Sequence, residues 1–150
     1  MNRRRLSAWT QLMPALMLAA CAGGTPAPQQ ADQEAKRFGP PSPDKGALYV
    51  VRPGWYGFAQ RVGVAIPGGA SAQLGANSYL RLEGPPGQVE VGCKVGDKTG
   101  TAQVQMADGQ VRFVEVSMTF GWWSPGCEVA EVPPDKGQAA VLLAKRIEAQ

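Results

Sequence analysis

The sequence predicts an all-β domain: a small antiparallel β-sandwich or barrel of about seven short strands, with a C-terminal helix and a disordered N-terminal signal and tether. Its 150 residues include 19 glycines and 13 prolines, which favour short strands joined by turns over helical bundles. Runs of Val, Ile and aromatic residues recur between these breakers, and several alternate apolar with polar residues. The connections are short enough for antiparallel neighbours, which favours a sandwich or a barrel over a parallel sheet.

The first expected strand is the run ALYVVRP, which ends at a proline. The run QVEVGCKV alternates cleanly, so that Val89, Val91, Cys93 and Val95 share one face. Asp108-Gly109 separates two later runs and is a hairpin signal. The expected strands lie at residues 47–53, 61–66, 88–95, 101–106, 110–118 and 127–132, with two short pieces at 72–74 and 78–82.

The last segment, residues 133–150, has a helical period. Asp135 is a suitable N-cap, and Lys145 and Arg146 lie toward the C-terminal end, where they suit the helix dipole. We expect the apolar stripe of this helix to pack on the sheet, with docking of a partner as the alternative. The stripe consists of Ala139, Leu142, Leu143 and Ile147.

The beginning of the chain has the pattern of a secretory signal. Three arginines at residues 3–5 precede an apolar core at residues 12–20, which is shorter than the about 20 residues that a membrane-spanning helix needs. The segment ends in LAAC, which resembles the lipobox of bacterial lipoproteins. The four lipobox residues are Leu18, Ala19, Ala20 and Cys21.

The lipobox resemblance implies a lipoprotein signal peptide over residues 1–20, cleaved before Cys21, and a diacylglycerol with acyl chains such as palmitate on the Cys21 thiol. Two or three such chains would hold the protein firmly in a membrane. The alternative is a chance cysteine after an ordinary signal. Ala22 follows the cysteine, and by analogy it points to a bacterial cell envelope location at the outer membrane, facing the periplasm.

Residues 21–44 contain the acylated cysteine and a stretch of small residues, glutamines and prolines without a repeating apolar period. Such a stretch cannot bury enough apolar surface to order itself, so we expect a flexible linker between the anchor and the folded domain. A transient helix over residues 29–36 is the less favoured alternative.

The layout resembles a family of small bacterial proteins, often lipoproteins, built around the domain of unknown function DUF2846. The resemblance covers residues 45–132 and rests on GALYVVRP, NSYLRLEGPPGQVEV and VRFVEV, in that order. The segment GWWSPGCEV departs from the family pattern. The family implies the β domain but supplies no catalytic residues.

The residue types present argue against several classes of function. Histidine is absent, which removes the commonest general base and metal ligand. Apart from the three N-terminal arginines, 15 − 3 = 12 basic residues balance 12 acidic ones, so nothing favours nucleic acid. We expect the acidic residues to be solvated side chains on turns and on the polar faces of strands. We therefore expect no enzyme, no metal and no cofactor.

With Cys21 acylated, two cysteines remain, and an exported protein meets an oxidising compartment. We expect Cys93 and Cys127 to form a structural disulfide. The alternatives are two buried free thiols and, less favoured, a redox or metal site, for which two cysteines without histidine make a poor set.

Two loops, GWYGF and FGWWSPG, place large rings among glycines beside a proline. They form a candidate binding surface for an envelope protein or glycan, because such rings dominate binding hot spots. The alternative, slightly favoured by the sequence, is that the rings cap the open ends of a small core. The candidate surface consists of Trp55, Tyr56, Phe58, Trp122 and Trp123.

Together these patterns predict a membrane-anchored, non-enzymatic β domain that binds or supports an envelope protein or glycan. A second hypothesis is a carrier that holds a small apolar ligand or lipid inside the sandwich. An enzyme ranks third, and a pocket around Glu90 or Cys93 would be its sign.

Overall fold

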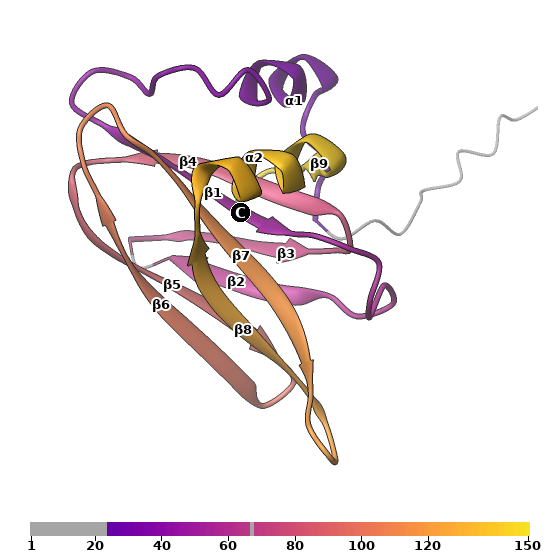
Figure 1. Cartoon of the computed structure of the whole chain (residues 1–150). Helices are drawn as coiled ribbons and strands as arrows, with labels where there is room; N and C mark the ends of the chain where they lie inside the picture. The colour runs from indigo at the N-terminus through magenta and orange to yellow at the C-terminus, as the bar shows by residue number, and fades with distance from the viewer. Residues whose placement is uncertain (1–23, 67) are drawn as a thin grey trace, which may run out of the picture.

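Two β-sheets packed face to face form the body of the molecule, and two helices cover the outer face of one sheet (Figure 1). The computed structural model describes residues 24–66 and 68–150. The expected signal peptide of residues 1–20 and the acylation site at Cys21 lie outside the described residues. Neither helix of the described chain combines the length and the apolar character needed to cross a bilayer.

The predicted β-rich class with a helix near the C-terminus is confirmed, as a sandwich of nine strands whose sheets do not close into a barrel. One sheet has the order β8-β7-β1-β4-β9, and the other has the order β3-β2-β5-β6. The elements are α1 (Gln29–Ala35), β1 (Gly46–Arg52), β2 (Val62–Ile66), β3 (Ala70–Leu74), β4 (Ser78–Gly84), β5 (Gly87–Val95), β6 (Lys98–Met106), β7 (Val111–Phe120), β8 (Pro125–Val132), α2 (Pro134–Leu143) and β9 (Lys145–Arg146).

The expectation that all neighbouring strands are antiparallel is wrong, because β1 pairs parallel with β7 and β4 pairs parallel with β9. The segment at Asp108-Gly109 is not a hairpin: it carries the chain from β6 in one sheet to β7 in the other. The hairpin of β6 is made with β5 instead, through Gly96 and Asp97. A turn signal is local, whereas the choice of sheet depends on which faces must be covered.

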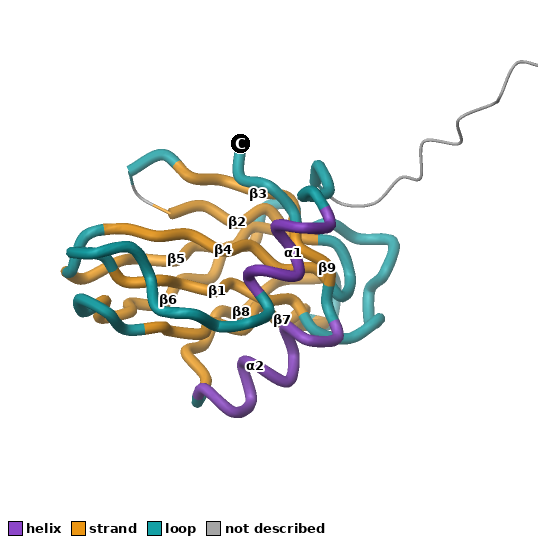
Figure 2. The backbone as a smooth tube through the Cα atoms, turned by 90° about the horizontal axis from the view of Figure 1, so that it is seen from above, coloured by secondary structure: helices purple, strands orange, loops and turns teal. Residues whose placement is uncertain are grey.

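Strand β1 lies in the middle of its sheet and is buried along its whole length. One face packs Leu48 and Val50 against the second sheet, and the other presents Tyr49 to the helices. Seen from above, α1 lies over the strands of the five-stranded sheet (Figure 2). The molecule therefore has three layers, with one apolar cluster between the sheets and a second beneath the helices.

The flexible linker expected over residues 21–44 is wrong for residues 24–44, which are docked on the domain. Pro26 bridges Ile147, and the Glu148 amide donates to the Thr25 carbonyl at 2.9 Å. Helix α1 buries Ala35, and the Phe38 ring follows it onto Tyr49 and Phe113. A helix of seven residues, about two turns, with one buried alanine leaves no apolar period in the sequence. The uncovered aromatic face of the sheet supplies the docking site.

The predicted C-terminal helix is real but shorter than residues 133–150, since α2 ends at Leu143 and the chain continues extended. The predicted N-cap is wrong: Pro133 holds that position and Asp135 lies in the first turn. The predicted stripe is also wrong, since Ala139, Leu142 and Leu143 are exposed, and Ile147 is buried outside the helix. The edge of β4 decides this outcome, because it binds residues 145–147 as an added strand. The residues that α2 buries are Gly137 and Val141.

Candidate binding surface

One end of the sandwich collects the large apolar side chains that the fold leaves exposed. Because β1 and β7 run parallel, the 53–61 loop and the 121–124 turn leave the sheet at the same end. The C-terminus of α2 also reaches this end, since Lys145 pairs with Ser78 at the start of β4 (Figure 1). We call this the apolar end. Its eight side chains, exposed by 55% to 91%, are Trp55, Tyr56, Phe58, Phe120, Trp122, Trp123, Leu142 and Leu143.

The 53–61 loop is held from inside by Arg52, whose side chain is only 1% exposed. Its guanidinium donates to the carbonyls of Gln60 at 2.7 Å and Gly57 at 2.9 Å. Two further bonds reach the carbonyls of Leu74 at 3.0 Å and Tyr56 at 3.2 Å. Burial lowers the pKa of Arg52, and no carboxylate among the described residues pairs with it. The loop backbone therefore faces inward, and its rings face outward.

The second loop is the turn between β7 and β8. Phe120 pairs with Pro125, and the Gly121 amide donates to the Ser124 carbonyl at 3.2 Å, which closes the turn tightly. The two residues between them, Trp122 and Trp123, project into solvent, each about nine-tenths exposed. A four-residue turn at the tip of a hairpin has no core beneath it that the indoles could cover.

The structure brings the two predicted aromatic loops together. The rings of Tyr56 and Phe120 meet edge to face with their centroids 4.5 Å apart. The Trp55 and Tyr56 rings also lie edge to face, with centroids 6.5 Å apart. The alternative that these rings cap the core is wrong, since all five predicted residues are exposed. The strands close their own core, so the loops have no apolar opening to fill.

A cleft of about 370 Å³ lies beside the two tryptophans of the turn. It combines indole faces with hydroxyl groups and an ammonium group, a mixture that suits a ligand with both apolar and polar faces. The polar side chains lining it are Lys98, Thr99, Thr119 and Ser124.

The predicted disulfide between Cys93 and Cys127 is confirmed, with the two Cα atoms 6.2 Å apart. It joins β5 of one sheet to β8 of the other, next to the cleft. Gly100 lies directly above it: a Cβ there would lie 2.6 Å from the Cys127 carbonyl oxygen. The bridge thus fixes the turn end of the β7–β8 hairpin on the four-stranded sheet.

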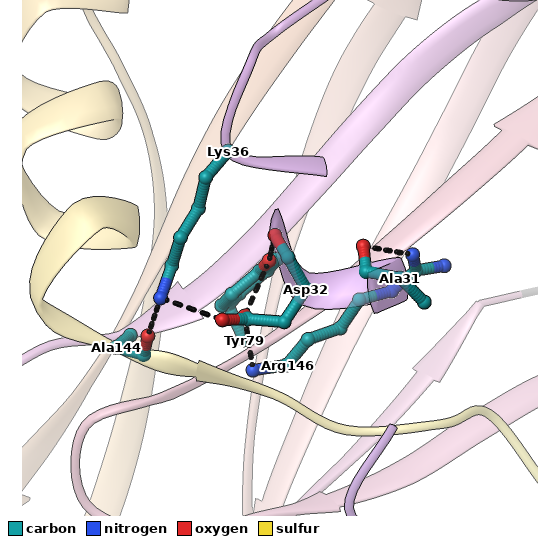
Figure 3. Close-up of polar contacts among 6 residues, drawn as sticks. All are labelled: Ala31, Asp32, Lys36, Tyr79, Ala144 and Arg146. Carbon is teal, nitrogen blue, oxygen red and sulfur yellow. Dashed lines mark hydrogen bonds and ion pairs between the residues drawn. The ribbon is translucent and has the colours of Figure 1, made fainter. Parts of the chain in front are cut away.

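Polar side chains that the sequence did not single out hold the N-terminal segment in place (Figure 3). The Asp32 carboxylate accepts from Lys36 Nζ at 2.9 Å, from the Tyr79 hydroxyl at 2.9 Å and from the Arg146 amide at 3.0 Å. Burial raises the pKa of Asp32, but these bonds outweigh it and the pKa is lowered. Burial and the Asp32 bond raise the pKa of Tyr79. Lys36 also donates to the Ala144 carbonyl at 2.7 Å.

A second chain of bonds continues along the same face. Ser42 Oγ donates to Glu83 at 2.7 Å, and Arg81 donates to Glu83 at 2.7 Å and to the Tyr49 hydroxyl at 3.0 Å. The bond from Ser42, together with Arg81, lowers the pKa of Glu83 to about 2. The Tyr49 hydroxyl in turn donates to the Ala35 carbonyl at 2.7 Å. Tyr79, Arg81 and Glu83 alternate along β4 and therefore share one strand face, but nothing in the local sequence shows that the N-terminal segment covers them.

The opposite end of the sandwich has an apolar cavity of about 430 Å³ between the two sheets. Its apolar lining includes Leu48, Ile66, Leu82, Val89 and Met106. A further cleft, of about 390 Å³, does have Cys93 in its lining, which is the sign named for the enzyme hypothesis. The Cys93 sulfur is in the disulfide, however, and the Glu90 carboxylate accepts from Gln103 at 2.7 Å. Within residues 24–66 and 68–150, no three His, Cys, Asp or Glu side chains gather as a metal site.

Comparisons with protein-family models, with curated proteins and with solved structures find no match for this chain. The resemblance to DUF2846 therefore stays a prediction.

Proposed function

We propose that this chain is a bacterial envelope lipoprotein, anchored through acylated Cys21, whose non-enzymatic β domain binds an envelope glycan or protein. The observation that supports it is the exposure of Trp122 and Trp123 beside a polar cleft. Exposed indoles cost free energy in water, and they are common where a partner covers them.

Of the two partner classes, a glycan is favoured by the cleft. The C–H face of a sugar ring stacks on an indole, while its hydroxyls need hydrogen-bond partners close by. Thr99, Thr119 and Ser124 offer hydroxyls, and Lys98 offers an ammonium group whose side chain is 56% exposed. The disulfide and the tight turn hold these groups in one arrangement, so little ordering is needed on binding.

The anchor is tested by the intact mass of protein extracted from bacterial membranes, with and without reduction. The expected mass fits residues 21–150 with a diacylglyceryl group and an acyl chain, and it rises by two hydrogens on reduction. A mass without lipid would refute the membrane location.

Glycan binding is tested by isothermal titration calorimetry of the purified protein with soluble envelope glycan fragments. Replacing Trp122 and Trp123 with serine is expected to abolish binding. The matched control is Trp55→Ser, which removes an exposed indole outside the cleft. Equal loss in both variants, or binding unchanged in the double variant, would refute the assignment of the cleft. Photo-crosslinking from position 122 in cells distinguishes a protein partner from a glycan.

The apolar cavity at the opposite end favours a second candidate function, a carrier for a small apolar ligand. Its sign would be a lipid that co-purifies with the protein under native conditions, together with silent crosslinks from positions 55 and 122.

A further inference from the structure

We infer that the part of the apolar end nearest the N-terminus, made of Trp55, Tyr56, Phe58, Leu142 and Leu143, rests on the lipid surface of the membrane that holds Cys21. This inference rests on the proposed acylation of Cys21. It concerns a different part of the apolar end from the cleft at Trp122 and Trp123. It follows from where the docked chain begins.

The domain begins almost at the anchor. The sequence suggests a linker over residues 21–44, which would reach about 80 Å if extended. Since the chain is tied to the domain from Thr25 onward, only two residues lie between Cys21 and Gly24, and the three Cα–Cα steps span at most about 11 Å. An acyl group on Cys21 would therefore hold the domain against the bilayer, and the surface around Gly24 would face lipid.

Contacts place Gly24 at the apolar end. It lies between Ile147 and the C-terminal end of β3. A Cβ built on Gly24 would be 2.8 Å from Ile147 Cδ1 and 3.1 Å from the Gln73 carbonyl oxygen. The next residue, Leu74, accepts a hydrogen bond from Arg52, which also holds the 53–61 loop. Figure 1 shows the described chain beginning beside the β3–β4 turn, at the end where the β1–β2 loop and the C-terminus of α2 also lie.

Asn77 joins the two apolar segments at this end. Its side-chain oxygen accepts from the Gly54 amide at 2.8 Å, and its carbonyl accepts from the Lys145 amide at 2.9 Å. The start of the aromatic loop and the end of α2 are thus fixed to the same turn. The patch is prearranged around the point where the chain meets its anchor.

The chemistry of the patch fits a lipid interface. Tryptophan and tyrosine prefer the headgroup region, where the ring is apolar and its polar atom stays hydrated, and leucines enter the layer beneath. Beyond the signal, acidic and basic residues balance, so long-range attraction to anionic lipid contributes little. We therefore expect a contact driven by the aromatic rings and insensitive to salt.

The experiment uses the full protein purified from bacterial membranes and mixed with vesicles of phosphatidylethanolamine and phosphatidylglycerol. Once the signal is removed, Trp122→Phe with Trp123→Phe leaves Trp55 as the sole tryptophan. Its emission is expected to shift to shorter wavelength and to be quenched by a lipid carrying a nitroxide near the headgroup, at low and high salt alike. The matched control replaces Trp55 with Phe as well and adds Asp108→Trp, an exposed turn at the opposite end. This control should stay unquenched.

Protein that floats with the vesicles while Trp55 is unquenched would overturn this inference and leave the anchor intact. A blue-shifted but unquenched Trp55 would overturn it too, by identifying a protein surface or another copy of the chain as the cover. Protein that does not float would refute the acylation itself, and with it the contact that depends on it.

Discussion

Replacing Arg52 with methionine removes four hydrogen bonds, three to carbonyls of the 53–61 loop and one to the Leu74 carbonyl of β3. Methionine keeps much of the side-chain volume but donates nothing. A hydrogen bond from a charged group contributes about 1.5–3 kcal/mol, and a buried carbonyl left unpaired costs about 1–3 kcal/mol. Three of the four bonds are only partly buried, so water can bond to those carbonyls in the variant and recover part of the lost free energy. The variant also no longer has to bury a charged guanidinium that lacks a carboxylate partner, which offsets a further part of the loss. We expect a loss of about 2–4 kcal/mol in the free energy of unfolding.

Urea denaturation followed by far-ultraviolet circular dichroism measures this loss, with Arg37→Met as the matched control on an exposed arginine. Hydrogen exchange should show lost protection in residues 53–61 of the Arg52 variant, and the ring contact of Tyr56 with Phe120 should weaken. A change within about 0.5 kcal/mol, the usual effect of a surface substitution, would refute the role assigned to Arg52.

Three further predictions concern stability. Replacing Cys93 and Cys127 with alanine opens a loop of sequence separation 34 and should lower the free energy of unfolding by about 3–4 kcal/mol in urea titrations. Gly137→Ala should lower the melting temperature, although alanine is the better helix former, because its Cβ would overlap the Phe113 side chain; a more stable variant would contradict this packing. Glu83→Gln should lower the free energy of unfolding by about 1 kcal/mol at pH 7, because Ser42 and Arg81 hold the pKa of Glu83 at about 2, against 4.5 ordinarily. The site is partly hydrated, which keeps the effect smaller than the full pKa shift would give.

The pH dependence of the Glu83 effect follows from the sign of its shift. A lowered pKa stabilises the folded state above the ordinary pKa, and the contribution disappears as the pH falls from about 4.5 to about 2. The difference in unfolding free energy between the parent and Glu83→Gln should therefore be constant above pH 5 and shrink below it. A difference that grows on acidification would contradict the ion pair with Arg81.

Sequence patterns were informative where burial is decided within one strand. The alternation around Cys93 places that side chain in the core, and the pairing of the two cysteines was predicted from their number and from the expected export of the chain. The aromatic loops were found because rings among glycines cannot alternate as strand residues do. Their exposure was not predictable, since it depends on whether the strands close the core without them.

Local patterns misled where a distant segment decides the outcome. The Asp108-Gly109 turn leads to another sheet, and the C-terminal helix gives way to a strand because the β4 edge was free. Arg52 reads as a strand-ending arginine, and only the tertiary fold gathers carbonyls from the 53–61 loop and from β3 around it.

By itself, the sequence determined the β-rich class, the first strand, the disulfide and the aromatic loops, because each depends on side-chain types within a short span or on a count of cysteines. The tertiary structure alone decided that residues 24–44 are docked, that the exposed apolar side chains meet at one end, and that the chain enters the domain there. These outcomes depend on which faces remain uncovered after the sheets have formed, and burying a face depends on segments far apart in the chain.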